Sequence, residues 1–274
     1  MIGRADGASP AQPTGRSGLF TMQTALTLPR VVAPEALDEL APCDPAAQRS
    51  RRDLARIHRV MATRRIMAHA WQRLVPSARA LEPLRVLEIG AGDGTLLLGV
   101  ARLLTPHWPR VQLTLLDRQP VVSAATLSAY ARMGWAATVQ AADVLDWAAA
   151  AGVSAQPSTE RQTAPPWDLI TSSLFLHHFE GAQLDAVLAA VASRALRFFA
   201  CEPRRGWLAL AGSHLVGALG ANAVTRADAV LSVHAGFRAH ELSALWRGAS
   251  GWRCEEAAAG LFSHCFSAQR VGSA

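Results

Sequence analysis

Short runs of apolar residues alternate with longer, mixed segments from about residue 84 to the end of the chain. Short apolar runs bounded by turn-forming residues are typical of strands buried in a sheet. We therefore predict a series of strands with connecting segments between them. The predicted strands are residues 85–89, 111–116, 137–141, 167–172, 194–201, 251–258 and 262–270.

Helical segments fall between several of these strands. Residues 95–104, 121–133 and 183–193 are predicted to be helices. When strands and helices alternate in this way, the strands pair in parallel through right-handed crossovers and the helices cover both faces of the sheet. We therefore predict an α/β fold of the Rossmann-like type over residues 83–274.

An N-terminal helical cap is predicted in front of this domain, over residues 30–82. One helix should begin near Pro34, because proline suits the first turn of a helix. A second helix should cover residues 45–74 and carry an apolar stripe. The residues of this stripe, at three- and four-residue spacing, are Leu54, Ile57 and Met61.

Three further segments depart from the pattern. Residues 1–29 are rich in glycine, proline, serine and arginine and are predicted to be a disordered tail. Residues 152–166 are expected to form a surface loop. Residues 206–246 are predicted to be a mostly helical insert in the domain. The apolar content of this insert suggests a lid over a hydrophobic substrate, although an apolar stripe is more often ordinary core.

The first predicted strand ends in a glycine-rich loop, Gly90-Ala91-Gly92-Asp93-Gly94, which opens the following helix. Close glycines let the backbone turn tightly and approach a ligand without interference from Cβ atoms. The N-terminus of the helix offers free N–H groups. Such a loop at the carboxyl edge of an open sheet is typical of nucleotide-type ligands. A dinucleotide fingerprint would instead place its third glycine where this chain has Thr95.

Acidic residues stand at the ends of the first three predicted strands. Glu88, two positions before Gly90, suits a cationic cofactor end, such as an ammonium or sulfonium group, better than a pyrophosphate. Asp117 ends the second strand, where a carboxylate can accept hydrogen bonds from both hydroxyls of a ribose. Asp143, two residues beyond the third strand, is positioned for an adenine amino group. Each acid alone could equally be a helix cap or a surface charge.

This combination resembles motif I and the next two motifs of the class I S-adenosylmethionine (SAM)-dependent methyltransferases, over about residues 84–202. The resemblance implies a seven-stranded, mostly parallel sheet with an antiparallel last strand. It also implies SAM as the cofactor, with its methionine moiety beside Glu88 and Gly90, its ribose on Asp117 and its adenine on Asp143. The cofactor-binding residues expected on this basis are Glu88, Gly90, Ala91, Gly92, Gly94, Asp117, Arg118, Asp143, Val144 and Ser172.

Two later segments favour a small-molecule acceptor. Residues 176–179, Leu-His-His-Phe, and residues 202–205, Glu-Pro-Arg-Arg, are similar to methyltransferases that act on quinone rings and polyketide-like phenols. The strand-four signature of the quinone-biosynthesis enzymes proper is missing. The Asn/Asp-Pro-Pro-Tyr/Phe and Pro-Cys signatures of enzymes that methylate nucleic-acid bases are also missing from this region. We therefore expect methyl transfer to a small, hydrophobic or phenolic acceptor.

His177 and His178 are the predicted catalytic residues. Methyl transfer from a sulfonium is an in-line displacement that depends mainly on positioning, and a hydroxyl nucleophile also benefits from a general base. Both histidines follow the fourth strand, where the methyl group should point, and histidine has a pKa in the right range. The plainer alternative is that they cap or pack the next helix. His214, His234 and Glu202 are weaker candidates.

Three alternative functions stay open, and the charge of the chain bears on one of them, a nucleic-acid methyltransferase. The formal net charge is +6 and all 27 basic residues are arginine, which suggests a compositional bias rather than an acidic partner. Nucleic-acid surfaces tend to interleave aromatic with basic residues, and the most basic stretch does not. The alternatives are a nucleic-acid methyltransferase, a degenerate methyltransferase fold that acts as a binding module, and an NAD-type oxidoreductase. The arginines expected to face solvent are Arg49, Arg52, Arg56 and Arg59.

Cysteine usage and hydropathy bear on metals and location. The four cysteines form no CxxC pair and no His/Cys cluster at metal-ligand spacing, so no metal is expected. Their scatter fits a reducing, cytoplasmic environment. No apolar run reaches the length of a membrane span. The expected partner is a small-molecule substrate rather than nucleic acid, and the sequence does not indicate an oligomeric state.

Overall fold

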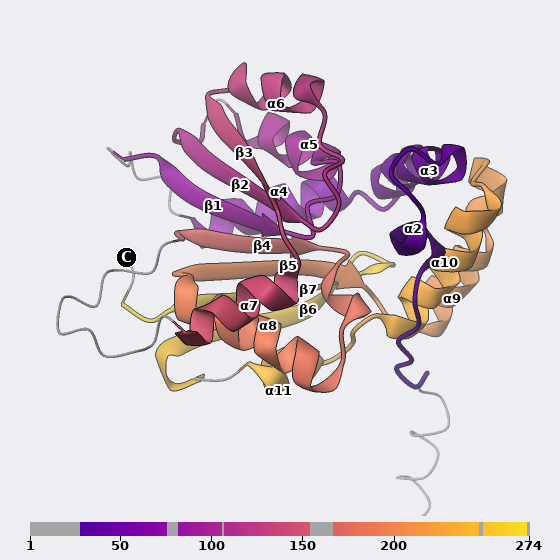
Figure 1. The fold of residues 1–274 in the computed structure, drawn as a ribbon. Coiled ribbons are helices and arrows are strands. Elements are labelled where there is room, and N and C mark those ends of the chain that lie inside the picture. Colours follow the sequence, from indigo (N-terminus) through magenta and orange to yellow (C-terminus); the bar gives the residue numbers. More distant parts are fainter. Residues whose placement is uncertain (1–27, 76–81, 106, 154–166, 247–248, 273–274) are drawn as a thin grey trace, which may run out of the picture.

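The computed structural model describes residues 28–75, 82–105, 107–153, 167–246 and 249–272. Most of the predicted disordered tail and of the predicted surface loop at residues 152–166 therefore lies outside the described residues. Figure 1 shows a twisted sheet with helices on both faces and a further group of helices beyond one end of the strands.

The sheet has seven strands in the order β3-β2-β1-β4-β5-β7-β6. Strands β1 to β5 pair in parallel, and β7 is antiparallel to both of its neighbours. The predicted seven-stranded, mostly parallel, Rossmann-like sheet with an antiparallel last strand is confirmed. The strands are β1 (Leu84–Ile89), β2 (Val111–Asp117), β3 (Trp135–Ala141), β4 (Leu169–Ser173), β5 (Arg197–Pro203), β6 (Trp252–Ala259) and β7 (Ser263–Arg270).

Helices cover both faces of this sheet, as predicted. The side chains of β1 alternate between the two layers, with Val86 in one core and Leu87 in the other, so the strand is buried along most of its length. The first core contains α4 (Thr63–Leu74), α5 (Thr95–Leu104) and α6 (Ala124–Ala131). The second core contains α7 (Val144–Val153), α8 (Gly181–Arg194) and α11 (Glu241–Leu245).

Strand β5 begins and ends later than predicted. Helix α8 continues to Arg194, so the strand begins at Arg197 and extends to Pro203. All of its residues are buried. Glu202, which was expected in a loop after the strand, therefore lies inside the strand with its side chain buried.

The single helix predicted over residues 45–74 is two helices, α3 (Pro45–Val60) and α4. The break is at Ala62, whose φ of 55° cannot continue a right-handed helix. Helix α4 packs Met67 and Trp71, both fully buried, against the sheet. The predicted N-terminal cap thus contributes one helix to the layer on the sheet as well as helices that lie beyond the strand ends.

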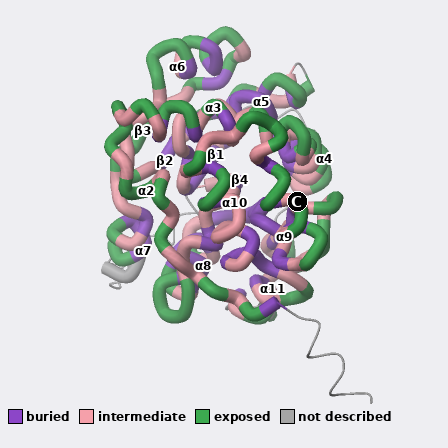
Figure 2. The backbone as a smooth tube through the Cα atoms, turned by 90° about the vertical axis from the view of Figure 1, so that its right-hand side faces the viewer, coloured by how far each residue is buried: buried purple, intermediate pink, exposed green. Residues whose placement is uncertain are grey.

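A roof of helices lies beyond the carboxyl ends of the strands (Figures 1 and 2). Asp228 on α10 accepts hydrogen bonds from the backbone N–H groups of Ala36 (2.9 Å) and Leu37 (3.0 Å), and so caps α2. Asp53 on α3 accepts a hydrogen bond of 2.8 Å from the backbone N–H of Asn222, just before α10. The roof comprises α2 (Ala36–Glu39), α3, α9 (Trp207–His214) and α10 (Ala223–Ala235).

The predicted insert at residues 206–246 divides between the roof and the sheet. Helices α9 and α10 belong to the roof, whereas α11 packs against β6. Trp246, which follows α11, stacks on Phe198 with ring centroids 5.5 Å apart. Only the first part of the insert therefore lies over the strand ends.

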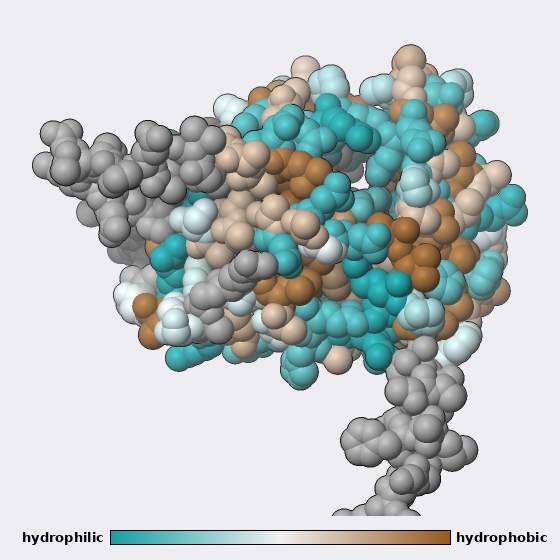
Figure 3. Space-filling model, turned by 60° about the horizontal axis from the view of Figure 1, so that its bottom comes forward, coloured by the Kyte–Doolittle hydropathy of each residue, from teal (hydrophilic) through white to brown (hydrophobic). Residues whose placement is uncertain are grey.

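The coloured part of the face drawn in Figure 3 mixes hydrophilic and hydrophobic side chains. Trp207 and Leu208 on α9 are each 57% exposed. The arginines of α3 that were predicted to face solvent are exposed. No helix in the described ranges is long and apolar enough to cross a membrane.

Replacing Trp71 by alanine should destabilise the whole fold, although the residue belongs to the N-terminal region. Its side chain is fully buried and stacks on Trp108 with centroids 5.6 Å apart. Truncation should lower the free energy of unfolding by about 3–5 kcal/mol, measured by chemical denaturation. The exposed neighbour Gln72 provides the control, since Gln72→Ala should change it by less than about 0.5 kcal/mol. Equal stability of both variants would contradict the placement of α4 in the core.

Candidate functional site

A cavity of about 910 Å³ lies between the carboxyl edge of the sheet and the roof. It opens beside β1 and β4, where the strand order reverses direction, and open α/β sheets bind ligands at such switch points. Most of the predicted site residues meet here. Those that line the cavity are Glu88, Gly90, Ala91, Gly92, Asp117, Arg118, Asp143, Val144, His177 and His178.

The glycine loop is shaped for a close backbone approach. Gly90 and Gly92 have φ values of 69° and 54°, which side chains other than glycine rarely adopt. A Cβ atom on Gly90 would lie 2.1 Å from the ring of Phe175. The backbone N–H of Gly92 donates a hydrogen bond of 2.8 Å to Oδ2 of Asp117, which ties the loop to the end of β2.

Asp117 is fixed by the backbone on both of its oxygens. While Oδ2 accepts from the loop, Oδ1 accepts a hydrogen bond of 2.8 Å from the backbone N–H of Gln119. Each carboxylate oxygen has two lone pairs, so the group can still accept hydrogen bonds from a ligand. The side chain is thus held in place at the edge of the cavity.

Glu88 is a buried acid without a complete set of partners. It is 2% exposed, lines the cavity, and its Oε2 has no hydrogen-bond partner among the described residues. Burial, together with the charges of Asp117 and Asp93, raises the pKa of Glu88 well above its ordinary value. A buried, unpaired carboxylate is costly, and a cationic group in the cavity would offset that cost.

Asp143 both caps a helix and lines the cavity. Its Oδ1 accepts a hydrogen bond of 2.7 Å from the backbone N–H of Leu145, so it caps α7, and it also lines the cavity beside Val144. Arg118, further along the same edge, donates a hydrogen bond of 3.1 Å to the backbone carbonyl of Asp38 in the roof. The helix-cap role that the sequence left open is therefore observed for Asp143.

Two residues predicted to bind the cofactor, Gly94 and Ser172, do not line the cavity. The carbonyl of Gly94 accepts a hydrogen bond of 2.8 Å from the hydroxyl of Tyr130. Ser172 is fully buried, and its hydroxyl donates to Glu202 at 3.4 Å. The expected contact of these two residues with a cofactor therefore stays a prediction that the cavity lining does not support. Two weaker catalytic candidates also fall outside the lining: His214 and His234.

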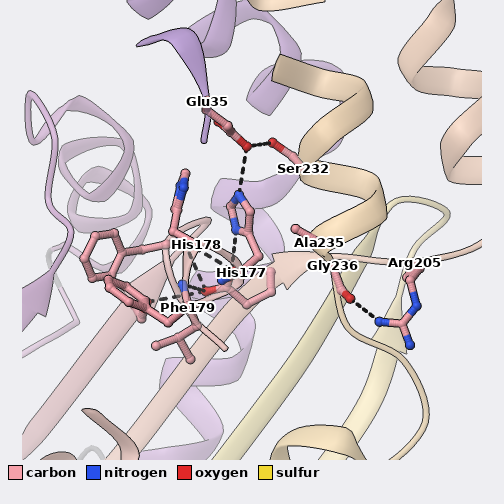
Figure 4. A network of polar contacts seen from close by, with 12 residues as sticks. Glu35, His177, His178, Phe179, Arg205, Ser232, Ala235 and Gly236 are labelled. Carbon is pink, nitrogen blue, oxygen red and sulfur yellow. Dashed lines mark hydrogen bonds and ion pairs between the residues drawn. The ribbon is translucent and has the colours of Figure 1, made fainter. Parts of the chain in front are cut away.

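His177 links the sheet to the roof (Figure 4). It lies in a short helix, Leu176–His178, and is 2% exposed. Its Nδ1 is 2.9 Å from Oε2 of Glu202, and its Nε2 is 3.3 Å from Oε1 of Glu35. Burial lowers the pKa of His177, but the hydrogen bonds with Glu202 and Glu35 outweigh it and raise the pKa to about 9. Both ring nitrogens are therefore engaged by carboxylates.

Glu202 holds the segment that carries the histidines. It is fully buried and accepts hydrogen bonds of 3.1 Å from the backbone N–H groups of Phe175 and Leu176. Its Oε2 also meets the ring of His177. Glu202, a weaker catalytic candidate in the sequence, does not line the cavity and acts as an anchor beneath it.

His178 lies beside His177, with ring centroids 4.2 Å apart. Its Nδ1 is 3.3 Å from Oδ2 of Asp38, a residue of the roof. Burial, and then the charge of His177, lowers the pKa of His178. The two predicted catalytic residues thus share one wall of the cavity, and each faces a carboxylate from the roof.

These carboxylates come from a segment, residues 28–40, that we call the strap. Arg30 anchors it by donating hydrogen bonds of 2.8 Å to the backbone carbonyls of Phe179 and Ala235. Beyond this anchor, Glu35 and Asp38 reach the cavity. Neither acid stands in a sequence pattern that marks a site residue. Glu35 is 142 positions from its partner His177, so no local pattern could pair them.

The strap also shapes the electrostatics of the wall. Burial would raise the pKa of Glu35, but the hydrogen bond and charge of His177 outweigh it and lower the pKa, with a further hydrogen bond from Ser232. Among the described residues, Glu35, His177 and His178 each offer one metal-ligating atom, and these atoms lie within 4.8 Å of one another. The spacing of residues along the chain gave no sign of this group, because Glu35 is far from the two histidines in the sequence.

Gly90→Ala should damage the site far more than Gly92→Ala. Both positions have positive φ, so each substitution brings backbone strain on the order of 1–2 kcal/mol. Only at Gly90 would the added Cβ also overlap Phe175, because nothing lies within 4 Å of a Cβ at Gly92. Thermal unfolding should show the larger loss of stability for Gly90→Ala, and equal losses would contradict the close packing of the loop.

No protein-family model and no curated protein matches the sequence. Among solved structures, an O-methyltransferase family protein from Burkholderia thailandensis is similar, with a TM-score of 0.52 at 17% identity over 85% of this chain. A protein from Nostoc punctiforme PCC 73102, assigned as an O-methyltransferase, matches with a TM-score of 0.50 at 15% identity over 90% of this chain. The chain spans 62% and 66% of the lengths of these two proteins. The described chain therefore shares the fold of these two proteins, and its Rossmann-like sheet is the one predicted from the sequence.

Proposed function

We propose that this protein is a SAM-dependent methyltransferase that acts on a small, hydrophobic acceptor. The fold and the cavity at the switch point support this proposal. The observation that carries it is the buried carboxyl group of Glu88, which lines the cavity and whose Oε2 has no hydrogen-bond partner among the described residues. The ammonium group of SAM would supply a partner for it.

The other acids of the cavity edge suit the rest of the cofactor. Asp117, held by two backbone N–H groups, would accept hydrogen bonds from the ribose hydroxyls. Asp143 and Val144, at the start of α7, would lie against the adenine. SAM carries a positive charge and no phosphate, so a row of acids favours it over a pyrophosphate-bearing dinucleotide.

The roof supports a small, apolar acceptor. The stripe predicted from the sequence lines the cavity: Leu54 and Ile57 on α3, and Met61 directly after it. Val216 and Leu219, in the short helix Val216–Leu219 after α9, line the same space. Apolar side chains on this side would hold an apolar acceptor against the methyl group of the cofactor, and positioning is the main requirement of this displacement.

In this proposal, His177 and His178 lie beside the nucleophilic atom of the acceptor, where the predicted role is that of a general base. Both line the cavity on the side of β4, and the cofactor residues lie on the side of β1 to β3. An acceptor between the roof and the glycine loop would meet the imidazoles. The exposed arginines Arg49, Arg52, Arg56 and Arg59 do not line this cavity, so they give no support to a nucleic-acid acceptor at this site.

Glu88→Gln should stabilise the free protein and weaken SAM binding. The folded pKa of Glu88 is raised above its ordinary value of 4.5, so ionisation costs stability as the pH rises through and above that value. The gain in melting temperature from the neutral amide should be present at pH 7 and disappear near pH 4. SAM affinity, measured by calorimetry at pH 7, should fall by about 10- to 150-fold, since a hydrogen bond to a charged group is lost. A variant that binds SAM normally would overturn the role given to Glu88.

Asp117→Ala should weaken SAM binding by on the order of 1–3 kcal/mol, because the charged acceptor for the ribose hydroxyls is removed. Asp146, an exposed acid on the first turn of α7, is the matched control. Asp146→Ala removes the same charge outside the cavity and should leave the dissociation constant unchanged. Similar affinities for both variants would rule out the ribose contact.

A further inference from the structure

Three side chains on one wall of the cavity are arranged as ligands of a single ion. Glu35, His177 and His178 each present one ligand atom, all within 4.8 Å of one another. Nε2 of His177 and Oε1 of Glu35 are 3.3 Å apart. Two ligands at about 2.0–2.1 Å from one tetrahedral ion are separated by roughly this distance. The spacing therefore leaves room for an ion without a change of backbone.

Glu202 orients one of these ligands in the way that metal sites use. Its buried carboxylate meets Nδ1 of His177 at 2.9 Å, so Nε2 is directed toward Glu35. A metal-bound histidine almost always donates its other ring N–H to a carboxylate or carbonyl, which fixes the ring and strengthens the ligand. Glu202 is itself held by the backbone N–H groups of Phe175 and Leu176, so the ring is pre-positioned.

His178 is paired with a different acid: Oδ2 of Asp38 lies 3.3 Å from its Nδ1. The third ligand, Glu35, is held from the other side by the hydroxyl of Ser232 on α10. Each ligand thus contacts a neighbour that is not itself a ligand. Figure 4 shows the contacts of Glu35 with Ser232 and with His177. A wall that served only as packing for the next helix would not need three separately held polar groups.

The charge around this wall also favours a cation. Three carboxylates, those of Glu35, Asp38 and Glu202, surround the two imidazoles. Arg30 is a nearby fixed positive charge, and its guanidinium is used on backbone carbonyls rather than on these acids. Two imidazoles and one carboxylate are a ligand set of catalytic zinc sites, which keep a position open for another ligand.

We propose that Glu35, His177 and His178 bind a divalent transition-metal ion of the zinc type, which takes a hydroxyl oxygen of the methyl acceptor as a further ligand. Such an ion would lower the pKa of that hydroxyl. The ion site stands on the geometry alone, whereas its use on an acceptor rests on the function proposed above. The acceptor is then an alcohol or phenol rather than an amine or a carbon nucleophile.

Titration of the full chain with Co²⁺, after treatment with a chelator, tests the site directly. Co²⁺ occupies zinc-type sites and reports its coordination by visible absorption. We expect one ion per chain, displaced by Zn²⁺ but not by Mg²⁺, because imidazole ligands disfavour Mg²⁺. Glu35→Ala and His178→Ala should each weaken Co²⁺ binding at least tenfold. Both residues are only partly buried, so the variants should fold.

His69 on α4 is the control, because it is exposed and lies outside the cavity. His69→Ala should bind Co²⁺ like the parent. No stoichiometric binding, or binding that Glu35→Ala and His178→Ala leave unchanged, would overturn the site. SAM affinity is measured on the same samples and separates the two proposals. Loss of Co²⁺ with SAM binding retained in Glu35→Ala supports the ion site, and Co²⁺ binding by a chain that binds no SAM would reject the methyltransferase proposal alone.

Discussion

The buried carboxylate of Glu202 connects the sheet to the chemistry at its edge. It lies near the end of β5 and accepts hydrogen bonds from backbone N–H groups of the turn after β4. It also orients the ring of His177. Burying a carboxylate costs free energy, and several hydrogen-bond donors are needed to offset that cost. Its position is in turn fixed by the parallel pairing of β4 with β5, so the wall of the cavity depends on the sheet register.

The strap and the roof supply the part of the cavity lining that the sheet does not. The strap brings Glu35 and Asp38 to the histidines, and Asp228 on α10 holds the start of α2 directly after Glu35. Residues far apart in the sequence thus converge on one wall through the helices above it. The same helices close the cavity with apolar side chains, so one layer provides both the polar groups and the enclosure.

The sequence predicted the elements that depend on local patterns. The alternation of strands and helices predicted the sheet. The glycine loop, with Glu88 and Asp117, predicted residues that line the cavity at the edge of the sheet. It missed features set by tertiary contacts. The break at Ala62 has no glycine or proline to mark it, and α4 was assigned to the cap because its apolar face does not say what it packs against.

The site was predictable to a similar extent. Residues that follow strand ends were found because those ends share one edge of the sheet. Ser172 does not line the cavity, and the sequence could not show this, because a residue of a buried strand can point to either face of the sheet. Glu35 could not be found, because its role arises only when the strap crosses the strand ends.

Calorimetric titration of the unmodified chain with SAM, with NAD as the comparison, tests the central claim most directly. The account predicts saturable binding of SAM to one site and no binding of NAD, because the row of acids pairs with a cation and repels a pyrophosphate. Binding of NAD in place of SAM, or of neither, would contradict it.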